Sequence, residues 1–164
     1  MRMANRNSVI VARLGDQARC SEAGLFSFVL VLSGSIRAPE RLASARAPFI
    51  ACLKSGECPE AECGDKGSLG YFIGFRPELI NGKFESGIPE KTEPSDDPCL
   101  AKDIELMEPF TFDSGYARKL IPQESEFLAQ ILEKSHSLYR AKDDPYWPGR
   151  IAAFLREALY VLRQ

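Results

Sequence analysis

The spacing of the apolar residues changes once along this chain, near residue 121, and that change constrains the fold more than any other feature. Before it, short apolar segments rich in β-branched and aromatic residues predict strands. The predicted strands are Ser8–Arg13, Leu25–Leu32, Phe49–Leu53 and Leu69–Phe75. Short polar stretches containing glycine separate them, as is typical of turns. We expect Asp103–Leu106 and Pro109–Phe112 to extend this β region.

After residue 121 the spacing is that of amphipathic helices. Pro122 suits a first helical turn, and the residues that follow form one apolar stripe: Phe127, Leu128, Ile131, Leu132, Leu138 and Tyr139. A second helix is expected from Pro148, with a stripe of Ile151, Phe154, Leu155, Ala158, Leu159 and Leu162. No Gly or Pro follows this stripe, so the sequence contains no signal that would end the helix before Gln164. We therefore expect a longer polypeptide that continues past this residue.

An acidic, proline-rich stretch lies between Phe84 and Leu100. Its prolines disfavour both a helix and a central strand, so we expect a long exposed loop. The segments up to residue 121 then predict an antiparallel barrel or sandwich, followed by two helices. A chain of 164 residues is the length of a single domain.

Composition narrows the class of protein. A net charge of −2 gives no domain-wide basic field of the kind that holds nucleic acid. The longest strictly apolar run, Phe28–Leu32, has five residues, far fewer than the ~18 of a membrane span. We expect a cytoplasmic protein with no membrane contact. Five cysteines without framework spacing indicate reduced thiols, and the sequence leaves a redox role for Cys58 and Cys63 open.

Sequence signatures of catalysis and of metal binding are missing. No glycine-rich loop leads into a Gly-Lys-Ser/Thr, and no Gly-x-Ser-x-Gly occurs. A single histidine, His136, excludes a multi-histidine metal centre, and its place in an apolar helix favours a structural role. The pairs Asp96-Asp97 and Asp143-Asp144 lie beside prolines in polar connectors, which indicates turn residues. The sequence predicts no catalytic residue, metal or cofactor.

Aromatic residues of the predicted strands are the candidates for a ligand site inside a barrel. They are Phe26, Phe28, Phe49, Tyr71 and Phe72. Strand alternation places Phe26 and Phe28 on one face, whereas Tyr71 and Phe72 must point in opposite directions. Arg37 could meet an anionic group of a small, largely apolar or aromatic effector. The alternatives are that the aromatic residues simply fill the core and that Arg37 is exposed.

The order of several segments resembles the N-terminal regulatory half of AraC-type bacterial transcription regulators. The segments are FSFVLVLSGSI, APFIACL, YFIGFRPELIN, the acidic proline-rich gap, MEPF and DPYWPGRIAAFLREALYVL. This resemblance implies a cupin-like barrel over residues 1–121 and a helical dimerisation segment over residues 122–164. It also implies that an effector controls a DNA-binding domain absent from these residues. The alternative is a free-standing cupin-type small-molecule-binding protein or cofactorless enzyme.

The second predicted helix is the expected homodimer contact. Its stripe is wide enough for one side to face the barrel while Leu155, Leu159 and Leu162 face a second copy. The alternative is that the whole stripe packs on the barrel. At the start of this helix, Trp147 and Arg150 are close enough to form a structural clamp between the two helices.

Overall fold

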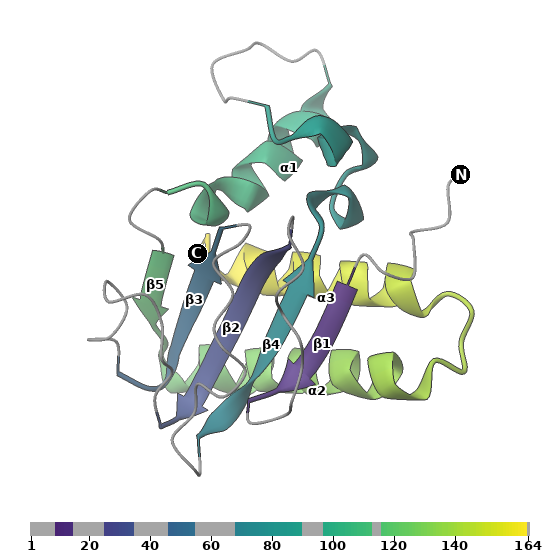
Figure 1. Cartoon of the computed structure of the whole chain (residues 1–164). Helices are drawn as coiled ribbons and strands as arrows, with labels where there is room; N and C mark the ends of the chain where they lie inside the picture. The colour runs from purple at the N-terminus through teal and green to yellow at the C-terminus, as the bar shows by residue number, and fades with distance from the viewer. Residues whose placement is uncertain are drawn as a thin grey trace.

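The computed structural model of the chain describes residues 9–14, 25–34, 46–54, 68–89, 97–112 and 116–163. Five strands form one antiparallel sheet in the order β1-β4-β2-β3-β5 (Figure 1). The strands are β1 Val9–Arg13, β2 Phe26–Ser33, β3 Phe49–Leu53, β4 Leu69–Phe75 and β5 Tyr116–Lys119. The four strands predicted before residue 80 are confirmed to within one residue at each end.

Two helices cover one face of this sheet. They are α2, Pro122–Ala141, and α3, Trp147–Val161, and they lie side by side behind the strands in Figure 1. Both helices are confirmed where the apolar stripes predict them. The main core lies between these helices and the sheet, because alternate strand residues such as Phe28, Leu30 and Ile73 meet the helical stripes there.

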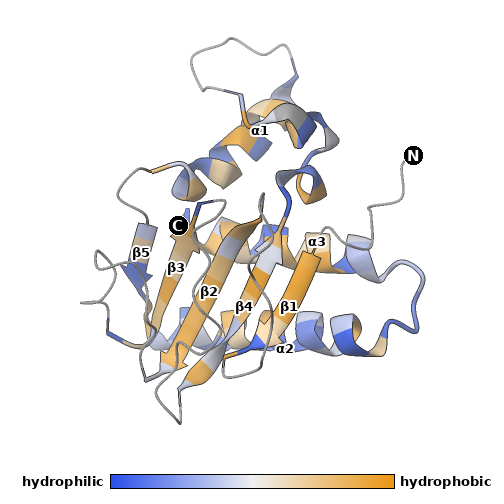
Figure 2. Cartoon of the chain, viewed as in Figure 1, coloured by the Kyte–Doolittle hydropathy of each residue, from blue (hydrophilic) through white to orange (hydrophobic). Residues whose placement is uncertain are grey.

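The opposite face of the sheet buries a second, smaller apolar cluster. It consists of Ala12, Val29, Val31, Phe49, Ala51, Leu53 and Phe72. Strand β2 contributes to both clusters, which explains its unbroken apolar run, as Figure 2 shows along the central strands. Among the described residues, no helix lies on this second face (Figure 1).

The segment between β4 and β5 is helical, and this corrects two expectations. Asp103–Leu106 belongs to the helix α1, Pro98–Met107, and residues 109 and 110 belong to the 3-10 helix η4, Glu108–Phe110. The predicted strands there are wrong. The Asp97 carboxylate caps α1 by accepting from the amides of Cys99 and Leu100. Pro109 lies in the first turn of η4, which ends at the C-cap Thr111.

The expected exposed loop is also wrong at both of its ends. Phe84 lies in the 3-10 helix η3, Gly82–Ser86, and its side chain is completely buried. A further 3-10 helix, η2, Pro77–Leu79, precedes it. Pro98 to Leu100 form the first turn of α1, where proline is well accommodated. Residues 90–96 lie outside the described residues.

The sheet is open, so the cupin-like barrel is not confirmed. Strands β1 and β5 form its opposite edges, and helices rather than a second sheet cover the larger core. An antiparallel sheet followed by two helices is the part of the expected fold class that the structure shows. The range 1–121 predicted as barrel contains α1 in addition to the strands.

Candidate functional site

The aromatic residues predicted to line a ligand site do not share one space. Phe26, Phe28 and Tyr71 lie on the helix-covered face, whereas Phe49 and Phe72 belong to the cluster on the opposite face. Tyr71 and Phe72 do point in opposite directions, as strand alternation requires. Phe28, Phe49 and Phe72 are buried among other apolar side chains. This arrangement corresponds to the alternative in which the aromatic residues fill the core and line no ligand site. Arg37 lies outside the described residues.

The three leucines expected at a dimer contact lie in the core of the protomer itself. Leu155, Leu159 and Leu162 are 0%, 1% and 8% exposed. Apart from the half-buried Phe154, the apolar stripe of α3 therefore packs within the chain, and these three leucines offer almost no surface to a partner.

Trp147 lies in the corner between α2 and α3, where a structural clamp is expected. Its ring is 3% exposed and packs edge-on against Tyr139, with 5.7 Å between the ring centroids. The cation beside it is Lys142, whose Nζ lies 5.4 Å from the Trp147 ring and 4.6 Å from the Tyr139 ring. Arg150 instead forms an ion pair with Asp144. The clamp thus contains a different cation from the one expected.

A polar cluster gathers where the β1 edge of the sheet meets α2, and we call Arg13, Tyr71, Glu133 and His136 the Glu133 cluster. Arg13 and Tyr71 are direct cross-strand partners on β1 and β4. Both donate to the Glu133 carboxylate, Arg13 Nη2 at 2.7 Å and Tyr71 through its hydroxyl. The His136 ring, one helical turn away and 5% exposed, lies 6.5 Å from the Tyr71 ring.

The electrostatics of the Glu133 cluster fix the charge states of Arg13, Tyr71 and Glu133. The hydrogen bond from Tyr71, together with Arg13, lowers the pKa of Glu133. Burial and the bond to Glu133 raise the pKa of Tyr71, and the bond to Glu133 also raises the pKa of Arg13. At neutral pH these three residues are therefore a carboxylate, a phenol and a guanidinium. Such an arrangement suits hydrogen-bonded recognition better than proton transfer, which works best with a pKa near 7.

The other edge of the sheet is tied to the same helix in a similar way. Arg118 of β5 donates to Glu124 of α2 at 3.2 Å and to the Val161 carbonyl of α3 at 3.3 Å. Glu124 also accepts from the Ile121 amide at the start of α2. The Arg118–Glu124 pair is less exposed than the Arg13–Glu133 pair. The side chains of Arg118 and Glu124 are 28% and 18% exposed, whereas those of Arg13 and Glu133 are 53% and 42% exposed. The Glu133 cluster is the more accessible of the two.

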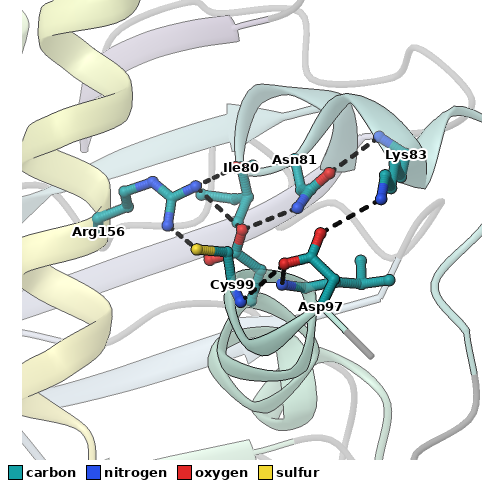
Figure 3. A network of polar contacts seen from close by, with 8 residues as sticks. Ile80, Asn81, Lys83, Asp97, Cys99 and Arg156 are labelled. Carbon is teal, nitrogen blue, oxygen red and sulfur yellow. Dashed lines mark hydrogen bonds and ion pairs between the residues drawn. The ribbon is translucent and has the colours of Figure 1, made fainter. Parts of the chain in front are cut away.

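A third polar group, the Asp103 network, joins α1 to α3. Figure 3 labels its members Arg156, Ile80 and Asn81. Asp103 is 6% exposed and accepts from Arg156 at 2.6 and 3.3 Å and from Asn81 at 2.9 Å. Arg156 also donates to the Ile80 carbonyl, and the bond to Asp103 raises the pKa of Arg156. Because Asp103 is buried, in contrast to the 42% exposed Glu133 side chain, and accepts from protein donors through both oxygens, we assign this network to holding α1 in place.

The described residues contain no group of three or more His, Cys, Asp or Glu side chains that could hold a metal ion. None of the described helices has the length and apolar character needed to cross a membrane. Cys52 is a buried free thiol and Cys99 an exposed one. Cys58 and Cys63, for which the sequence leaves a redox role open, lie outside the described residues.

Comparisons with protein-family models and with curated proteins found no match to this chain.

Sequence reasoning missed the Glu133 cluster because its members are far apart in the chain. Glu133 is 62 positions from Tyr71 and 120 from Arg13. One signal was available: alternation from Val9 and Val11 places Arg13 on the core-facing side of β1, where an arginine needs a partner. The identity of that partner depends on the register of β1 with β4 and on the position of α2.

Proposed function

We propose that this chain is a non-catalytic binding module with a regulatory role, and that the Glu133 cluster is its ligand contact. The observation that carries this proposal is the convergence of Arg13, Tyr71 and Glu133 from two strands and a helix at an accessible edge. Their charge states are fixed at neutral pH by the pKa directions given above. These three side chains therefore offer both a hydrogen-bond acceptor and a cation to a ligand.

The ligand class follows from the chemistry of these side chains. An aromatic ring can pack against Tyr71, while a polar substituent on it can exchange hydrogen bonds with Arg13 and Glu133. We therefore propose a small aromatic amide or acid, bound without metal. Binding at the junction of β1 and α2 would favour one arrangement of these elements over another, which is what a ligand needs to shift a regulatory equilibrium.

The regulatory part of the proposal is supported by the sequence resemblance to the N-terminal half of AraC-type transcription regulators. In such a protein the present chain is the cytoplasmic sensory module, and a DNA-binding domain outside these residues reads its state. DNA contact would then belong to that domain, in keeping with a net charge of −2 in the chain described here.

Thermal unfolding of the purified chain with a panel of small aromatic acids and amides tests the ligand contact. At a ligand concentration 100 times Kd, binding stabilises the folded state by about 2.7 kcal/mol. For a domain of this size that corresponds to a rise in Tm of about 5 to 11 °C. Tyr71→Phe removes the phenol hydroxyl, so we expect the rise to be strongly reduced in this variant and unchanged by a chelator.

Glu124→Gln is the matched control, because Glu124 lies on the same helix and pairs with an arginine of the opposite edge strand. It should keep the full ligand-induced rise in Tm. If no compound raises the Tm, or if Tyr71→Phe responds as strongly as the wild type, the Glu133 cluster is not the ligand contact. A rise abolished by chelator would contradict metal-free binding.

A further inference from the structure

The β5 edge of the sheet has no neighbouring strand on its outer side within the part of the chain that the structure describes. On its inner side β5 pairs with β3, and the hydrogen bond from the Leu120 amide to the Pro48 carbonyl joins two residues that face each other in this register. In an antiparallel pair every second residue bonds to the residue opposite. Counted from Leu120, the N–H and C=O groups of Ala117 and Lys119 therefore point away from β3, toward the outer side.

These backbone groups are available to a further strand. Ala117 and Lys119 are both exposed, and neither takes part in a turn, loop or cap hydrogen bond with another described residue. Figure 1 shows β5 at the margin of the sheet. Unpaired N–H and C=O groups along an edge strand form a template for an added strand, and extended peptides bind to many proteins in this way.

The side chains at this edge differ between the two faces of the sheet. Lys119 pairs with Phe49 and shares its face, where Lys119 is exposed and forms no ion pair with a described residue. On the helix-covered face, Tyr116 packs against the main core and stacks on Phe112, with 6.2 Å between the ring centroids. Phe112 is 42% exposed. A strand added beside β5 would therefore meet a cation on one face and an apolar aromatic surface on the other.

The charges at this edge select an acidic partner and disfavour a second copy of the chain. Arg118 and Lys119 are neighbours on β5, and Glu124 is the acid that pairs with Arg118. Arg118 also retains a buried donor, Nε, without a hydrogen-bond partner in the described part of the chain. If two β5 strands paired antiparallel through all their outward backbone groups, the two Arg118 side chains would face each other, and like charges directly opposite are destabilising. An acidic strand avoids this repulsion and gains the attraction of Lys119.

We propose that the β5 edge binds an extended segment of another protein as an additional antiparallel strand. Every pair of neighbouring strands in the sheet is antiparallel, and antiparallel pairing is slightly more stable per residue than parallel pairing. The segment has alternating acidic and apolar residues, with its acids beside Lys119 and its apolar side chains beside Tyr116 and Phe112. This site is at the opposite edge of the sheet from the Glu133 cluster and does not depend on the proposed ligand contact.

Titration calorimetry of the purified chain with the acetylated and amidated peptide Val-Glu-Val-Glu-Val-Glu-Val tests this proposal, and we expect the peptide to bind. Directly opposite residues of an antiparallel pair share a face, so the glutamates beside Lys119 are also the residues whose N–H groups point toward β5. N-methylation of the glutamates should raise Kd about tenfold or more, because it removes the donors to the Ala117 and Lys119 carbonyls. N-methylation of the valines, whose N–H groups point to solvent, should leave Kd nearly unchanged.

Variants of the protein test the same contacts from the other side. Ala117→Pro removes an outward N–H group, which an edge strand tolerates, so it should raise Kd about tenfold or more with little change in Tm. Lys119→Glu should raise Kd about threefold or more and should bind Val-Lys-Val-Lys-Val-Lys-Val better than the wild type does. Lys134→Glu makes the same charge change at an exposed position of α2 and should bind the acidic peptide like the wild type.

Three results would overturn the proposal. The first is a wild type that does not bind the acidic peptide at millimolar concentration. The second is equal binding of the peptides methylated on glutamate and on valine, because the contact would then not be an added strand. The third is equal binding of the acidic peptide by Lys119→Glu and Lys134→Glu, because the contact would then lie away from β5.

Discussion

At the scale of single residues, Glu133 should make the stability of this protein depend on pH in the acid range. Its folded-state pKa is lowered, first by the Tyr71 hydroxyl and then by Arg13. A carboxylate with a depressed folded pKa stabilises the fold above its unfolded pKa of about 4.3, and this contribution disappears as the pH falls through the folded value. The effect is modest, because the side chain is 42% exposed.

We therefore expect the Tm of the wild type to fall more steeply below about pH 4.3 than that of Glu133→Gln, which has no proton to gain there. The difference in Tm between the two proteins should be largest near neutral pH. The pKa of Asp97 is also lowered, so in both proteins the Tm should still fall with decreasing pH through the loss of this second carboxylate. Parallel Tm curves measured by calorimetry from pH 7 to pH 3 would contradict the assigned role of Glu133.

Asp103 is the residue whose loss should cost most stability among the charged side chains described here. Asp103→Ala removes the acceptor of Arg156 Nη1 and of the Asn81 side-chain amide, while Arg156 keeps its bond to the Ile80 carbonyl. Hydrogen bonds to charged groups contribute roughly 1.5–3 kcal/mol, so we expect the free energy of unfolding to fall by about 2–3 kcal/mol. Glu105→Gln on the same helix, in an exposed pair with Arg163, should lower it by less than about 1 kcal/mol. Urea denaturation measures both, and equal losses would show that burial of Asp103 is unimportant.

At the scale of elements, α2 fastens both edges of the open sheet. Glu124 holds Arg118 of β5, and Glu133 holds Arg13 of β1. Edge strands lack one set of hydrogen-bonded neighbours and open more readily than central strands. We expect Glu133→Gln to speed amide hydrogen exchange in β1 while leaving β5 unchanged, and Glu124→Gln to do the reverse. Faster exchange across all five strands in either variant would indicate a global loss of stability instead.

The elements that the sequence predicted are those with a complete local signal. Strands β1 to β4 and helices α2 and α3 each carry their own apolar spacing, and the ends of these strands and the starts of these helices are predicted to within one residue. Helix α1 was not predicted, because the prolines between Phe84 and Leu100 disfavour a helix and outweighed its start signal, Asp97 followed by Pro98. An aspartate cap before a proline at the first helical position is compatible with a helix and does not disfavour it.

At the scale of the whole molecule, three expectations depended on contacts that local spacing cannot specify. They are the closed barrel, the aromatic ligand site inside it and the leucine dimer contact. Alternation correctly separated Tyr71 from Phe72, yet whether the sheet closes is decided by which strands become neighbours. Here β1 pairs with β4 and β5 with β3, so within the described part of the chain β1 and β5 each have one edge without a partner strand. The amphipathic spacing of α3 likewise predicted which side of the helix is apolar. It did not predict that this side would pack into the core of the same chain and not against a second copy.

The buried thiol of Cys52 should report when the fold opens. Cys52 lies in β3 between Phe28 of β2 and Tyr116 of β5, is 1% exposed, and its thiol pKa is raised by burial. The thiolate is the reactive form, so alkylation of Cys52 requires separation of the sheet from its helices. Exposed Cys99 on α1 should be alkylated in the native protein, whereas Cys52 should react only across the urea unfolding transition, as mass spectrometry of the labelled peptides would show. Labelling of Cys52 well below that transition would mean that β5 detaches before the core unfolds, and Glu124→Gln, which releases β5 from α2, should then increase it further.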